Sequence, residues 1–74
     1  MPLVLVKEDD KVIVLKITGN PAIKKRLEEL GFIEGALINI ISNNDGDVIL
    51  EIKGTKLAIT KEMSQKIIVK ALEK

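Results

Sequence analysis

Apolar residues in this chain recur at helical spacing in one segment and at strand-like spacing in the others. The stripe with a period of three to four residues consists of Ile23, Leu27 and Leu30. Asn20 is a favoured N-cap, and Pro21 suits the first helical position because no backbone N–H is needed there. Gly31 follows as a left-handed residue, which places Leu27 and Phe32 at the positions that commonly touch in a Schellman ending. The pattern predicts a helix over residues 21–30.

Elsewhere the pattern predicts short strands, with apolar runs or alternating apolar and polar positions. Five such segments are 12–17, 36–41, 48–52, 57–59 and 67–69, and the short apolar run 3–6 fits an additional opening strand. Gly35 is expected to turn the chain with a positive φ, and Asp45-Gly46 is a strong hairpin signal. Thr60 can cap one short helical turn. The prediction is one mainly β domain over residues 1–74, a small, strongly curved antiparallel barrel of about five strands whose open end is covered by the helix.

The alternation also assigns a face to each apolar residue. The residues predicted to point inward are Ile13, Leu15, Ile38, Ile40, Leu50, Ile52 and Ile59. The residues predicted to point outward are Val12, Val14, Leu37, Ile41, Ile49 and Ile68. A contiguous exposed patch among the second set would make a homo-oligomer or a partner contact the expected use of that surface.

Composition narrows the classes of function. The 74 residues carry a net charge of +1, so no overall field draws the chain to nucleic acid or anionic lipid. No apolar run approaches the roughly 20 residues that span a bilayer, and the start has no signal-peptide pattern. We therefore expect a cytoplasmic protein that does not insert into the membrane. Without cysteine and histidine, neither a usual iron or zinc site nor an activated nucleophile is expected, so we predict no cofactor, no tight metal site and no enzyme.

Nucleic-acid binding remains an alternative. Lys24, Lys25 and Arg26 form a small basic cluster, but Glu28 and Glu29 follow within a turn and no aromatic residues are available to stack bases. Residues 22–38 resemble the helix-Leu-Gly region of AbrB-type DNA-binding regulators, and a dimer would double the basic patch.

The order of motifs over nearly the whole chain resembles the FeoA family. The match centres on Arg26-Leu27, Leu30-Gly31 and Gly35, which are similar to the family's basic-Leu, Leu-Gly and Gly core. Residues 53–59 resemble its later hairpin, and residues 67–69 resemble its closing strand. Residues 8–10 depart from the Pro-Gly turn that often precedes the first long strand, and the central hairpin loop is shorter than usual.

The resemblance implies an SH3-like barrel and a non-catalytic accessory role in ferrous iron uptake. The implied partner is the cytosolic domain of FeoB, the GTPase-bearing membrane transporter. Similar domains occur at the C-terminal end of iron-dependent repressors. A stand-alone version of that regulatory domain is therefore a further alternative.

Two surfaces compete for the partner contact. One is the charged helix face, defined as Lys24, Lys25, Glu28 and Glu29. Its cations precede its anions, which opposes the helix dipole, so helix stability does not explain the order. A partner contact is one explanation, and a solvated face that tolerates the small cost is the alternative. The other is the outward aliphatic set around Val12, Val14 and Ile49.

Overall fold

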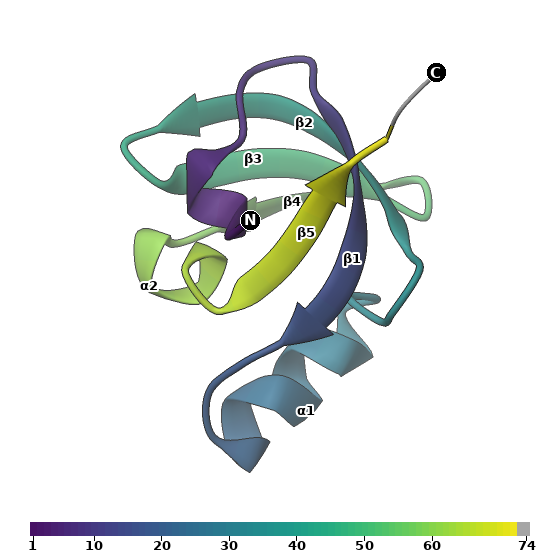
Figure 1. Cartoon of the computed structure of the whole chain (residues 1–74), viewed down its shortest axis with the longest axis vertical. Helices are drawn as coiled ribbons and strands as arrows, with labels where there is room; N and C mark the ends of the chain where they lie inside the picture. Colours follow the sequence, from purple (N-terminus) through teal and green to yellow (C-terminus); the bar gives the residue numbers. More distant parts are fainter. Residues whose placement is uncertain (73–74) are drawn as a thin grey trace.

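Within residues 1–72, five antiparallel strands form one strongly curved sheet in the order β4-β3-β2-β1-β5 (Figure 1). The computed structural model describes residues 1–72. Its strands are β1 (Lys11–Ile17), β2 (Leu37–Asn44), β3 (Asp47–Ile52), β4 (Thr55–Ile59) and β5 (Ile67–Ala71). Its helices are α1 (Pro21–Glu29), the short α2 (Lys61–Ser64) and the 3₁₀ turn η1 (Leu3–Leu5). The mainly β prediction is confirmed, although within residues 1–72 no strand pairing joins β4 to β5, so the sheet stays open.

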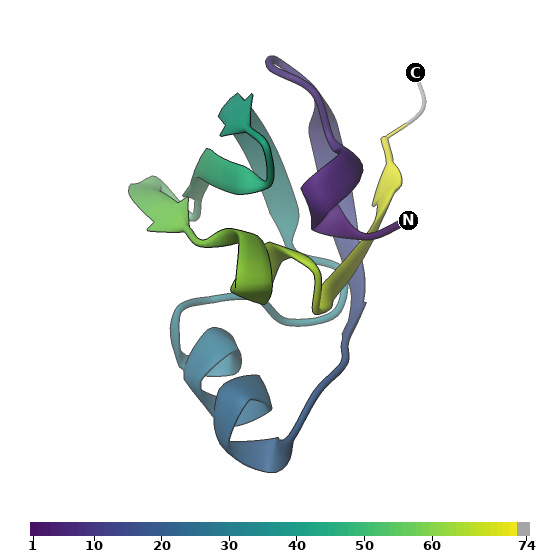
Figure 2. The ribbon, with the colours of Figure 1, turned by 90° about the vertical axis from the view of Figure 1, so that its left-hand side faces the viewer.

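Helix α1 begins and ends where the sequence predicts, within one residue. The Asn20 side chain accepts a hydrogen bond from the Ile23 N–H at 2.9 Å. At the other end the Phe32 N–H donates to the Leu27 carbonyl at 3.1 Å, and the Gly31 N–H donates to the Glu28 carbonyl at 3.0 Å. These two bonds define a Schellman ending, with Gly31 at φ +109°. Figure 2 shows α1 below one end of the sheet, where it contributes the fully buried Leu27 to the core.

The predicted faces of β1 are wrong, and a bulge is the reason. Val12 and Val14 are 0% and 1% exposed, whereas Leu15 is 41% exposed. The pairing with β5 shifts register between Val14 and Lys16, so Leu15 is an extra residue in the strand. The bulge returns Ile17 to the inner face of Val12 and Val14, where it packs against the core.

The other strands have the predicted faces. Ile38, Ile40, Leu50, Ile52 and Ile59 are buried, whereas Leu37, Ile41 and Ile49 are exposed. Both central hairpins turn on two residues with positive φ, which is the geometry of type I′ turns. These turns are Asp45-Gly46, with φ 53° and 98°, and Lys53-Gly54, with φ 51° and 77°.

Residues 3–6 do not form the predicted opening strand. Leu3–Leu5 wind into η1, which places Leu3 and Val6 in the core at 0% and 3% exposure. Ahead of it, Pro2 bridges to Ile68, and the Val69 N–H donates to the Met1 carbonyl at 2.7 Å. Residues 1–2 therefore cover the outer edge of β5, and η1 lies with α2 on the open side of the sheet (Figure 2).

Candidate functional site

The charged helix face is exposed along its whole length. The side chains of Lys24, Lys25, Glu28 and Glu29 are all accessible, while Leu27 on the other side of the helix is buried. The two lysines precede the two glutamates on α1, so each charge lies near the helix end that disfavours it. The surface is therefore available to a partner without unfolding the helix.

A hollow of about 150 Å³ lies between α1 and β1. We call it the α1/β1 hollow, and its lining residues are Val14, Leu15, Lys16, Ile17, Lys24, Glu28, Phe32 and Glu34. Val14 and Phe32 are 1% and 0% exposed, so its floor is apolar. The four charged side chains at its rim are exposed. An apolar floor within a polar, accessible rim is the usual anatomy of a protein contact.

The α1/β1 hollow joins only part of the predicted contact residues. It brings Lys24 and Glu28 of the helix face together with Val14, but neither Lys25 nor Glu29 lines it. The predicted outward position of Val12 is wrong, because its side chain is fully buried in the core. Val14 is equally buried and contributes only to the floor. Ile49 is 37% exposed on β3, away from this hollow.

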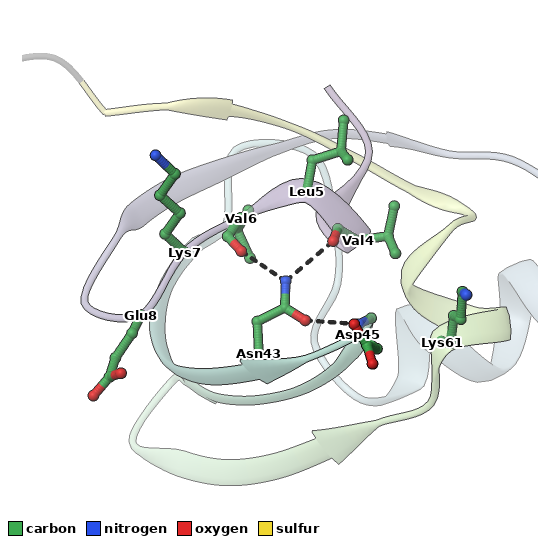
Figure 3. Close-up of a pocket in the computed structure, with 9 residues that line it drawn as sticks. Val4, Leu5, Val6, Lys7, Glu8, Asn43, Asp45 and Lys61 are labelled. Carbon is green, nitrogen blue, oxygen red and sulfur yellow. Dashed lines mark hydrogen bonds between the residues drawn. The ribbon is translucent and has the colours of Figure 1, made fainter.

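A second, more open hollow of about 540 Å³ lies between η1 and the β2–β3 hairpin (Figure 3). Asn43 lies at its centre and uses its amide to hold the chain together. Its Nδ2 donates to the Val4 carbonyl at 3.0 Å and to the Val6 carbonyl at 2.6 Å. Its Oδ1 accepts from the Gly46 N–H at 2.8 Å. Because these bonds are internal, we assign Asn43 a structural role.

Sequence reasoning missed Asn43 as a structural residue. The available signal was its place in the polar turn Ser42-Asn43-Asn44-Asp45-Gly46, because asparagine side chains often bond to nearby backbone in turns. The turn predicts the bond to Gly46. The two bonds to η1 join residues far apart in the chain, which no local pattern shows.

The described residues contain no group of three or more acidic, histidine or cysteine side chains placed to hold a metal ion. The absence of a tight iron or zinc site and the absence of catalysis both stay predictions. Of the helices in residues 1–72, none has both the length and the apolar character to cross a membrane.

Comparison with known proteins identifies the family. The family model of the FeoA domain matches residues 1–71. This chain belongs to the FeoA domain family. It is 36% identical over 72 residues to the "Putative Fe(2+) transport protein A" of Methanocaldococcus jannaschii, covering 97% of this chain and 88% of that protein. The resemblance seen in the sequence is therefore confirmed.

Solved FeoA structures share the fold. The crystal structure of an iron uptake regulatory protein (FeoA) superposes with a TM-score of 0.90 at 29% identity, over 97% of each chain. The zinc complex of Stenotrophomonas maltophilia FeoA, described as a procaryotic SH3 domain protein, gives a TM-score of 0.80 at 22% identity, over 95% of this chain and 89% of that one. These likenesses confirm the small SH3-like fold.

Proposed function

We propose that this chain is a non-catalytic accessory protein of ferrous iron uptake that binds the cytosolic domain of a FeoB-type membrane transporter. Family membership and the iron-transport name of its relative support the process. The α1/β1 hollow supports a binding role, because it joins buried apolar side chains to a rim of accessible charges. It is the single observation that carries the residue-level proposal.

The contact centres on Lys24 and Glu28, at the α1 side of the hollow. Both side chains line it, and both stand where the helix dipole disfavours their charge. The order of lysine before glutamate does not stabilise α1, and contact with a partner would explain it. Lys16 and Glu34 extend the same rim from the other side of the hollow.

We expect the contact to be transient. Small, partly polar interfaces belong to weak signalling encounters, in which rim charges act mainly on association rate and salt dependence. The accessory role needs only such an encounter, because the transporter carries the chemistry and the transport.

The double variant Lys24→Glu/Glu28→Lys tests the contact. It keeps net charge and the i,i+4 spacing of the pair, but reverses the charges beside the hollow. It also moves the anion toward the N-terminus of α1, which favours the helix. We expect the folded variant to bind the purified cytosolic domain of the transporter at least about tenfold more weakly, since like charges facing each other across an interface cost several kcal/mol. Surface plasmon resonance at two salt concentrations measures this.

The matched control is Lys25→Glu/Glu29→Lys, the same exchange one position further round the helix and outside the hollow. It should bind like the parent. If both double variants bind like the parent, the charged helix face is not the contact. If the parent itself does not bind the cytosolic domain, the proposed partner is wrong.

A further inference from the structure

The outer edge of β4 is the feature that the proposed function leaves unused. β4 pairs with β3 on one side and lies at the end of the sheet, at the margin of the molecule in Figure 2. At the opposite end, residues 1–2 cover the edge of β5. Because the Lys53-Gly54 turn makes Ile52 and Thr55 a hydrogen-bonded pair, the backbone groups of alternate residues point away from β3.

Those alternate residues are Lys56 and Ala58, and both are exposed. Within residues 1–72 no strand pairs with their N–H and C=O groups, so they form a pairing edge that is a template for another strand. An exposed lysine usually protects such an edge, because a second copy aligned on Lys56 would place two lysines opposite each other. Centring the pairing on Leu57 instead avoids the repulsion between the two lysines.

In this register a two-fold axis passes between the Leu57 residues of two antiparallel β4 strands. Lys56 of one copy then lies directly opposite Ala58 of the other, and these are the residues whose backbone groups point outward. Leu57, which is half-buried and packs against the core, meets Leu57 of the other copy on the inner face. Backbone pairing and apolar contact are therefore satisfied by the same alignment.

The side chains of this register are complementary too. A hollow of about 200 Å³ beside the edge is lined by Asp47, Ala58, Ile59 and Thr60. Lys56 of a second copy would enter over the small Ala58 side chain, and among residues 1–72 the one charged group that lines the hollow is the Asp47 carboxylate. One Asp47 oxygen accepts from the Lys61 N–H at 2.8 Å, which leaves the other for the incoming ammonium group.

We infer that the β4 edge is a self-association surface, on which a second copy of this chain pairs antiparallel about Leu57 and places its Lys56 against Asp47. The two copies contribute the same surface, as in most two-fold dimers. A contact made by one short strand is small, so the dimer is weak and reversible. This inference does not depend on transporter binding, because the α1/β1 hollow uses other residues.

Cross-linking tests the register. The chain has no cysteine, so Leu57→Cys introduces a unique thiol. At a non-hydrogen-bonded antiparallel pair the Cα atoms lie about 4.5 Å apart, within disulfide range. We expect mild oxidation to form dimers of Leu57→Cys at least about tenfold faster than of Leu37→Cys, because pairing raises the local thiol concentration. Leu37 is 47% exposed, so random collision favours the control.

Sedimentation provides the second measurement and does not depend on the cysteine variants. The parent should form dimers as concentration rises. Ala58→Lys fills the hollow and opposes Lys56, so its dimer should be at least about tenfold weaker. Ala71→Lys, an exposed alanine on β5, should behave like the parent. Equal cross-linking of the two cysteine variants, a monomeric parent, or a dimer unaffected by Ala58→Lys would overturn the inference.

Discussion

Gly31 ends α1 because its backbone adopts a conformation that a side chain resists. Its φ of +109° lies beyond the small left-handed region that other residues tolerate. A single Cβ has space here, because it would meet Ile52 Cδ1 at 3.6 Å, an ordinary contact. The cost of placing a Cβ at this position is therefore backbone strain.

We predict that Gly31→Val lowers the free energy of unfolding by about 1–3 kcal/mol. The β-branched side chain resists positive φ, while the Schellman bonds to Leu27 and Glu28 require it. Urea unfolding followed by circular dichroism measures the change. The control is Ala22→Val on the exposed face of α1, which should cost only a few tenths of a kcal/mol. An unchanged midpoint for Gly31→Val would refute the strain argument.

At the scale of the element, α1 is stable despite its charge order. We predict that Lys24→Glu/Lys25→Glu/Glu28→Lys/Glu29→Lys raises the free energy of unfolding by about 1–2 kcal/mol at low salt, at a few tenths per charge. High salt should reduce the gain by screening. Thermal melts at both salt concentrations check this. A variant no more stable than the parent would show that the dipole has no influence here.

The elements also show what the sequence can predict and what it cannot. Helix α1 follows from local signals, namely Asn20, Pro21 and Gly31, which act on their immediate neighbours. The faces of β3, and of β2 as far as Ile41, follow from strict alternation. The faces of β1 do not, because the bulge at Leu15 arises from pairing with β5, which no pattern within β1 records. The error reached the candidate site, since it presented Val12 and Val14 as exposed contacts.

The remainder of the candidate site depended on spatial neighbours. Lys24 and Glu28 were recognisable as an unusual charge order. Only the packing of α1 against β1 shows that these two residues lie beside Phe32 and Val14. The same packing leaves Lys25 and Glu29 outside the hollow. η1 was predicted as a strand because a short apolar run fits either state, and only its tertiary contacts decide.

At the scale of the whole molecule, Asn43 joins η1 to the β2–β3 hairpin. We predict that Asn43→Ala lowers the free energy of unfolding by about 1–3 kcal/mol, because the Val4 and Val6 carbonyls lose a partly buried donor. Asn44→Ala, at the exposed neighbouring position, should stay within about 0.5 kcal/mol of the parent. Urea titration of both variants gives the comparison. Equal effects would mean that water replaces the lost bonds.

The position of β1 in the sheet has a consequence for folding kinetics. β1 pairs with β2 and also with β5, so strands from near both ends of the described chain lie side by side. Such a topology has high contact order and folds in milliseconds to seconds, more slowly than a helical bundle. During synthesis at roughly 5–20 residues per second, β1 leaves the ribosome seconds before β5 exists. For that interval the apolar side chains of β1 lack the partners that β5 supplies, and the core is complete only when β5 has emerged.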